Sequence, residues 1–163
     1  MSEAKLKVKW RQAAKEQGFW VRALSPHQIP GLPDIVVADV GASEATRAMR
    51  RTRHHWIEAK LARLAAKNKL VFSAPRDATA QQIRWALYCH ELGIPAWWLL
   101  LDSSGWMLVP SGRLQVGFED WAKGIRRYGT ALTDLHEPEV GRAKLVEDGW
   151  SRLRRADQRA SQR

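Results

Sequence analysis

Two carboxylates and a lysine occur in a pattern suited to metal-assisted hydrolysis. Asp34 follows a Pro-Gly-Leu-Pro turn and opens a β-branched stretch, and Glu58 and Lys60 are two residues apart in a second strand-like segment. Residues two apart on a strand share one face. If the two strands pair, Asp34 meets Glu58, and adjacent carboxylates are costly unless a cation neutralises them. Mg²⁺ prefers oxygen ligands and keeps several waters, so it suits such a pair.

Lys60, the third residue of the pattern, indicates which reaction this candidate metal site could catalyse. A lysine beside the ion can orient or deprotonate a water molecule, and the ion stabilises charge that develops on a phosphate. Each residue alone has a plainer reading, because Asp34 can simply begin a turn and Glu58 and Lys60 can form a solvated strand face. The combination favours phosphodiester hydrolysis, since Ile57 and Ala59 on the opposite face are apolar.

The elements expected around these residues follow an α/β order. A helix is expected over residues 2–17, with Ser2 as its cap and Gly18 after its end. Strands are expected over residues 19–24, 34–40 and 55–61, the last two forming a hairpin. An amphipathic helix over residues 79–92 ends at Gly93 and precedes a buried strand over residues 96–101. The order α-β-β-β-α-β predicts a central mixed sheet flanked by helices.

The rest of the chain has weaker patterns. Residues 105–109 are expected to add an edge strand and residues 118–127 a helix. Residues 62–78 combine helical propensity with a loop signal at Pro75. We therefore predict a core over residues 1–101, an extension over 102–150 packed on that core, and a basic, flexible tail over 151–163 that contains five arginines and one acid.

The chain carries nine tryptophans, a high count for 163 residues. Trp10 and Trp20 are predicted to lie in the core, and Trp97 and Trp98 in the core or at a dimer face. Trp85 is off the main apolar stripe of its helix, so a dimer face suits it better.

Composition indicates a polyanionic partner. Lys and Arg outnumber Asp and Glu by 27 to 17, a net charge of +10. The longest apolar run is strand-sized and the first residues lack an apolar signal core, so we expect no membrane contact and a cytoplasmic location. Cys89 is the only cysteine. A single cysteine excludes an internal disulfide and a Cys-cluster zinc site, and Cys89 is expected to be a buried small hydrophobe.

The pattern resembles the signature of the PD-(D/E)XK nucleases. Pro33-Asp34 followed by Glu58-Ala59-Lys60 matches that signature, and the chain is most similar to the virus-type replication–repair branch (VRR-NUC), whose wider kinship includes Holliday-junction resolvases. In that branch a Gly-x-Pro-Asp motif opens the metal-binding strand, as Gly31 to Asp34 do here. A Gln begins the later helix and a Gly ends it, matched by Gln82 and Gly93. The resemblance covers about residues 1–101 and implies a restriction-endonuclease-like core.

The resemblance also implies a role for each matching residue. Asp34 and Glu58 would ligate Mg²⁺ or Mn²⁺, with the carbonyl of Ala59 as a further ligand. Lys60 would serve the nucleophilic water. Gln82 would help to orient the site or a phosphate.

The first helix carries a looser match. In the VRR-NUC branch this helix often has a Glu about four turns ahead of a Gly, which Glu3 and Gly18 match, so Glu3 would sit near the metal. Lys7 stands where the branch often has a Gln, and Glu16 is an alternative acid on the same helix.

Basic residues beside the candidate site are expected to contact DNA phosphates, which position a protein without reading sequence. A solvated loop is the alternative for the predicted hairpin tip. The adjacent pair His54 and His55 would point to opposite faces of a strand, which disfavours joint chelation of a metal. His27 precedes Asp34 in a loop and can either touch substrate or face solvent. The predicted DNA contacts are Arg47, Arg50, Arg51, Arg53, Arg63, Lys67 and Lys69.

These observations together predict a Mg²⁺-dependent DNA endonuclease. Through the resemblance, the expected substrate is branched DNA such as a Holliday junction, in phage-type recombination, replication or repair, and a homodimer is implied. A restriction enzyme or a nickase stays open within the same class. A catalytically inactive nucleic-acid-binding or phage structural module on the same fold is the alternative, and an RNA nuclease is a third reading because no residue reports a 2′-hydroxyl contact.

Overall fold

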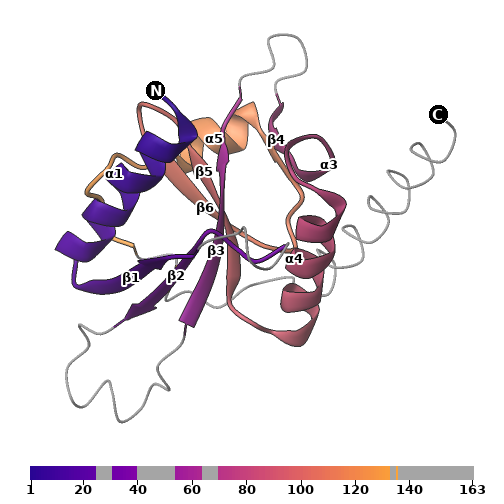
Figure 1. Cartoon of the computed structure of the whole chain (residues 1–163). Helices are drawn as coiled ribbons and strands as arrows, with labels where there is room; N and C mark the ends of the chain where they lie inside the picture. Colours follow the sequence, from indigo (N-terminus) through magenta and orange to yellow (C-terminus); the bar gives the residue numbers. More distant parts are fainter. Residues whose placement is uncertain (25–30, 40–53, 64–69, 133–134, 136–163) are drawn as a thin grey trace, which may run out of the picture.

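The computed structural model describes residues 1–24, 31–39, 54–63, 70–132 and 135. Figure 1 follows the elements along the chain. They are α1 (Glu3–Glu16), β1 (Phe19–Ala23), β2 (Ile35–Asp39), β3 (His54–Leu61), β4 (Leu70–Ser73), α3 (Ala74–Asp77), α4 (Ala80–Leu92), β5 (Ala96–Leu101), β6 (Trp106–Pro110), β7 (Gln115–Gly117) and α5 (Phe118–Gly124).

A five-stranded sheet in the order β1-β2-β3-β5-β6 forms the centre of the fold. β3 and β5 run parallel, and the other neighbours in this sheet are antiparallel. β4 and β7 pair in a separate two-stranded antiparallel sheet. The expected α/β class, mixed sheet and α-β-β-β-α-β order are therefore confirmed, with β4 and α3 inserted before α4. The predicted pairing of β2 with β3 is also confirmed.

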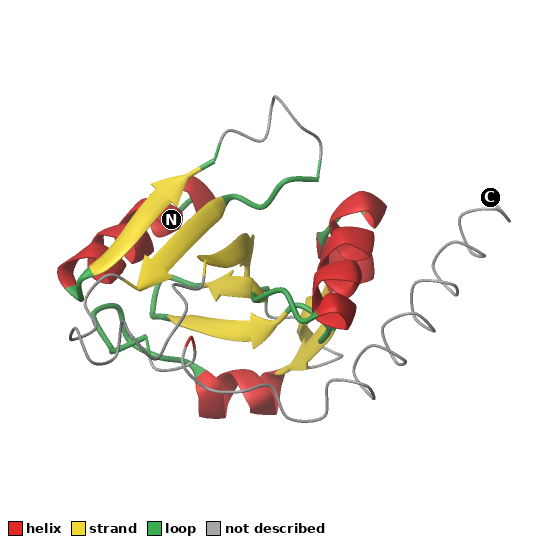
Figure 2. Cartoon of the chain, turned by 90° about the horizontal axis from the view of Figure 1, so that it is seen from below, coloured by secondary structure: helices red, strands yellow, loops and turns green. Residues whose placement is uncertain are grey.

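Helices α1 and α4 lie on opposite sides of the central sheet, as the views in Figures 1 and 2 agree. Every residue of β5 is buried, and successive side chains point to opposite faces of the sheet. The strand therefore contributes to two separate hydrophobic clusters. Trp97, Leu99 and Leu101 pack in the cluster that contains the α1 residues. Trp98 and Leu100 pack in the cluster of α4. β5, the parallel neighbour of β3, is thus packed from both sides.

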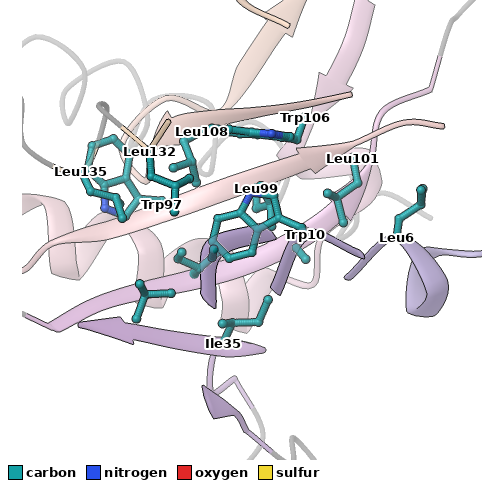
Figure 3. Packing of buried hydrophobic residues seen from close by; sticks show 14 residues of the cluster. Leu6, Trp10, Ile35, Trp97, Leu99, Leu101, Trp106, Leu108, Leu132 and Leu135 are labelled. Atoms are coloured by element: carbon teal, nitrogen blue, oxygen red, sulfur yellow. The ribbon is translucent and has the colours of Figure 1, made fainter. Parts of the chain in front are cut away.

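Helix α1 forms as the sequence predicts. The Ser2 hydroxyl accepts a hydrogen bond from the amide of Lys5, and Leu6 and Trp10 are each 1 % exposed. The Trp10 ring meets Trp106 of β6 edge-on, with centroids 6.2 Å apart. Figure 3 shows both indoles among the leucines of this cluster. Burial of these large side chains fixes α1 against the sheet.

Helix α4 also matches its predicted pattern. Thr79 caps its first turn, and Gly93 ends it in the left-handed conformation at φ 70°. The predicted apolar face is buried, and Cys89 is a buried residue of this helix as expected. Trp85 packs partly buried at the same cluster. Trp97 and Trp98 on β5 are buried. The buried α4 face consists of Ile83, Ala86, Leu87, Cys89 and His90.

Three sequence predictions need correction. Trp20 is 43 % exposed rather than in the core, because β1 is an edge strand and only Phe19 and Val21 face the cluster. The helix expected over residues 118–127 ends at Gly124, and Arg126 instead bridges to Trp106. The loop signal at Pro75 marks the first turn of the short helix α3, a position that proline favours.

Described residues after position 101 pair with the central sheet and contact the end of α1. β6 is the expected edge strand and pairs with β5. The Gln17 side chain at the end of α1 donates to the carbonyl of Thr130 at 2.8 Å and accepts from the amide of Leu132 at 2.9 Å. The expected tail over residues 151–163 lies outside the described residues. Within the described part, no helix is both long enough and apolar enough to span a bilayer.

Candidate active site

Asp34 and Glu58 lie side by side where β2 begins. The register pairs Ile35 with Ile57, so one step further along each strand places Asp34 opposite Glu58. Asp34 Oδ2 accepts a hydrogen bond from the backbone amide of Ala59 at 3.0 Å. The strand pairing therefore brings together the two carboxylates that the sequence singles out, and it fixes one oxygen of Asp34.

Glu58 and Lys60 share one face of β3, as their spacing predicts. Lys60 Nζ lies 2.9 Å from Glu58 Oε1. The same carboxylate oxygen accepts a hydrogen bond from Gln82 Nε2 at 2.6 Å, and Lys60 Nζ donates to Gln82 Oε1 at 3.2 Å. The three side chains form a closed triangle of polar contacts, so each orients the other two.

Gln82 reaches this triangle because of its place in the capping box of α4. Its backbone amide donates to Thr79 Oγ1 at 3.2 Å, and its side-chain Oε1 accepts from the Thr79 amide at 3.0 Å. The Gln82 side chain therefore both caps the N-terminus of α4 and hydrogen-bonds to Glu58 and Lys60. The Thr-x-x-Gln spacing is a recognised helix-start signal, so sequence can predict where this side chain points.

Lys7 is the residue that sequence reasoning missed. Its Nζ lies 2.8 Å from Glu3 Oε1 and 3.1 Å from Asp34 Oδ1. The Glu3 and Lys7 pair has the i, i+4 spacing of a helix ion pair, which was the available signal. Glu3 therefore reaches the carboxylate pair through Lys7. Glu16, the alternative acid, lies at the opposite end of α1 and accepts from Gln12 instead.

Burial sets the electrostatics of the pair. Glu58 is only 5 % exposed, and burial together with the charge of Asp34 raises its pKa to about 7, although Lys60 and Lys7 oppose the rise. For Lys7, burial alone lowers the pKa, but the contacts with Glu3 and Asp34 outweigh it and raise the pKa overall. The charges of Lys7 on α1, of Asp34 just before β2, and of Glu58 and Lys60 on β3 therefore act on one another in a single cluster.

The raised pKa of Glu58 predicts that the metal-free protein loses stability as pH rises. Between pH 4.5 and about 7 the folded carboxyl keeps its proton while the unfolded carboxyl releases it. Unfolding free energy therefore falls with pH across this window and then levels off. At about 1.4 kcal/mol per pKa unit, the loss is about 3 kcal/mol.

Glu58→Gln is the matched variant, because its amide cannot ionise. In EDTA, thermal unfolding of the variant should depend less on pH than that of the wild type, and the variant should be the more stable protein at pH 8. Parallel pH profiles for the two proteins would contradict this assignment.

The donor set fits a hard divalent cation. Among the described residues, no group of three or more His, Cys, Asp or Glu side chains is arranged to hold a metal ion. Mg²⁺ does not need such a group, since it is bound through one or two carboxylates and retained waters. Asp34 and Glu58 supply two carboxylates whose mutual repulsion a divalent ion would relieve.

The backbone conformation and close packing at position 31 explain why a glycine precedes the Pro33-Asp34 pair. Its φ is +85°, a left-handed conformation that favours glycine. A Cβ at this position would lie 2.8 Å from Cγ of Gln81, in the first turn of α4. The turn that leads into Asp34 therefore packs closely on the helix that supplies Gln82.

The predicted DNA contacts fall mostly outside the described residues, as does His27. Arg63 is exposed just after β3, where its amide donates to the carbonyl of Val71. His54 is exposed, whereas His55 is buried and accepts from Trp97 Nε1 at 3.2 Å. The opposite orientation predicted for this histidine pair is confirmed. The other predicted contacts, which lie outside the described residues, are Arg47, Arg50, Arg51, Arg53, Lys67 and Lys69.

Comparisons with known proteins give one distant structural likeness. No protein-family model matches the chain. No curated protein matches it in sequence. A solved structure of Hjc from Archaeoglobus fulgidus, described as a Holliday junction resolvase from an archaeal hyperthermophile, is similar at a TM-score of 0.48 with 14 % identity. The likeness covers 82 % of this chain and 94 % of that chain.

Proposed function

We propose that this chain is a metal-dependent DNA endonuclease whose active site is formed by Asp34, Glu58 and Lys60. One observation carries the proposal. A buried carboxylate, Glu58, lies beside a second carboxylate and accepts from both Lys60 and Gln82 at a single oxygen. The raised pKa of Glu58 means that its ionised form destabilises the metal-free fold near neutral pH. Perturbed groups of this kind gather at functional sites.

The proposed reaction assigns a different role to each side chain of the cluster. Asp34 and Glu58 would hold Mg²⁺ or Mn²⁺, with the Ala59 carbonyl as a further ligand. The ion supplies charge neutralisation for the phosphate and a more acidic bound water. Lys60, oriented by Gln82, would position the attacking water. To take the proton of that water, its ammonium group would first release a proton to solvent, which the field of a neighbouring divalent ion favours. Glu3 acts on the site through Lys7.

The substrate is proposed to be DNA, with branched DNA such as a four-way junction as the preferred form. The net charge of +10 supports a nucleic-acid partner. The preference for branches follows from the resemblance of the Gly-x-Pro-Asp, Glu-x-Lys and Gln82 motifs to the VRR-NUC and resolvase branch. Two symmetric cuts in a junction suit a homodimer.

A substrate panel tests this function. Labelled four-way junction, linear duplex, single-stranded DNA and single-stranded RNA are each incubated with the protein in Mg²⁺, Mn²⁺ or EDTA. We expect cutting of the junction that needs a divalent ion and exceeds cutting of the duplex. Binding of the junction with no cut in either metal would instead support a catalytically inactive binding module. Preferential cutting of RNA would show that the substrate is RNA rather than DNA, while metal-dependent phosphodiester hydrolysis would stand.

A further inference from the structure

Lys7 sits on the oxygen through which Asp34 would meet a cation. The other oxygen, Oδ2, is held by the Ala59 amide at 3.0 Å. Oδ1 faces Lys7 Nζ at 3.1 Å. A divalent ion on Asp34 and the ammonium of Lys7 therefore compete for one carboxylate oxygen, and their like charges repel at close range.

Glu3 gives Lys7 a partner that does not depend on Asp34. The Glu3 and Lys7 pair lies within one helix at i, i+4, with 2.8 Å between Oε1 and Nζ. The Lys7 side chain is 22 % exposed and that of Glu3 36 % exposed, so solvent reaches both. Lys7 can leave Asp34, turn outward and keep its ion pair, so its displacement leaves no unpaired buried charge.

The charge of Lys7 also reaches beyond Asp34. It lowers the pKa of Glu58, against the effects of burial and of Asp34, without contacting it in a salt bridge. One ammonium group thus partly neutralises both proposed metal ligands. Lys60 differs, because it lies on the same strand as Glu58 and Gln82 holds it in place.

We propose that Lys7 is an internal counter-cation that stabilises the metal-free site and is displaced from Asp34 when a divalent ion binds. This inference rests on the proposed function, because it assumes that Asp34 and Glu58 hold the ion. Lys7 weakens metal affinity and stabilises the empty fold, so ion binding exchanges one cation for another. The site then fills only when the ion outcompetes the lysine.

Mn²⁺ titration of the whole chain, by calorimetry and by electron paramagnetic resonance of free Mn²⁺, tests the exchange. Lys7→Gln should bind Mn²⁺ about tenfold more tightly than the wild type, the scale on which groups around a metal tune its affinity. Lys7→Arg keeps the cation and should stay weak. Lys5→Gln changes the net charge equally on an exposed position of the same helix and should bind as the wild type does.

Thermal unfolding gives a second readout that needs no activity. In EDTA, Lys7→Gln should unfold at a lower temperature than Lys5→Gln, since Asp34 and Glu58 lose a shared counter-charge. Saturating Mn²⁺ should then raise the melting temperature more in Lys7→Gln than in the wild type. A variant too unstable to titrate is replaced by Lys7→Met, for which the same order of affinities is expected.

The outcomes separate the two proposals. If the wild type binds Mn²⁺ and Lys7→Gln binds no tighter, or more weakly, the counter-cation role is wrong and the metal site stands. If neither the wild type nor any Lys7 variant binds Mn²⁺, the metal site and the counter-cation role are both wrong. If only Lys7→Gln binds measurably, the exchange is supported in its strongest form.

Discussion

Replacing Lys60 with methionine is expected to reduce cleavage by about 10²- to 10⁴-fold, the usual contribution of a positioned acid–base group. Methionine keeps most of the length and apolar surface of the lysine stem, so the packing beside β3 changes little. The ammonium group that lies 2.9 Å from Glu58 Oε1 and 3.2 Å from Gln82 Oε1 is lost. The chemical step should therefore fail while substrate binding remains.

Measuring Mn²⁺ affinity shows whether Lys60→Met loses only the chemical step or the metal site itself. Lys60 holds the pKa of Glu58 down, so its removal raises that pKa further, and Mn²⁺ affinity should be compared at pH 8.5, where Glu58 can ionise. We expect Mn²⁺ binding within about tenfold of the wild type under these conditions. Lys123→Met, on an exposed position of α5, is the control for loss of one lysine. Unchanged turnover in Lys60→Met would remove Lys60 from the mechanism.

Replacing Asp34 with asparagine is expected to lower Mn²⁺ affinity by more than about a hundredfold and to abolish cleavage, because outer-shell changes alone cost about ten- to a hundredfold. The asparagine carbonyl oxygen can still accept from the Ala59 amide, so the strand pairing should persist. The negative charge that a divalent ion needs is lost. Lys7 keeps Glu3 as its partner.

Asp120→Asn is the matched control for Asp34→Asn. Asp120 lies in α5 and pairs with Arg113 and the Gly117 amide rather than with the candidate site. Its variant should retain the wild-type Mn²⁺ affinity and turnover. Asp34→Asn that still binds Mn²⁺ as the wild type does would mean that the ion is held elsewhere.

Local sequence signals were enough to predict the elements that hold the site. Alternation predicts that Glu58 and Lys60 share a face, and the pairing of β2 with β3 then brings Asp34 to Glu58. Helical periodicity and the glycine stop predict α4 almost to the residue. These signals are reliable because each depends on neighbours within one or two elements.

The features that sequence missed depend on contacts between distant parts of the chain. β4 has its partner in β7, more than forty residues later, so the short stretch over residues 70–73 has no local pattern that marks it as a strand. The sequence predicts Trp20 in the core because periodicity does not reveal that β1 lies at the sheet edge. In the sequence, Lys7 is only a departure from the Gln that the VRR-NUC branch often has, and its contact with Asp34 depends on the packing of α1 beside that residue.

Glu58→Gln tests the central claim most directly, because stability and function should move in opposite directions in the same protein. The amide can still accept from Lys60 and Gln82, and the raised pKa of Glu58 means that its loss should stabilise the metal-free fold at pH 8. Cleavage of the four-way junction in Mg²⁺ is measured for both proteins, purified in parallel. We predict a loss of at least about a hundredfold in a variant that is as stable as the wild type or more so. Undiminished, Mg²⁺-dependent cleavage by Glu58→Gln would contradict the assignment of this cluster as the active site.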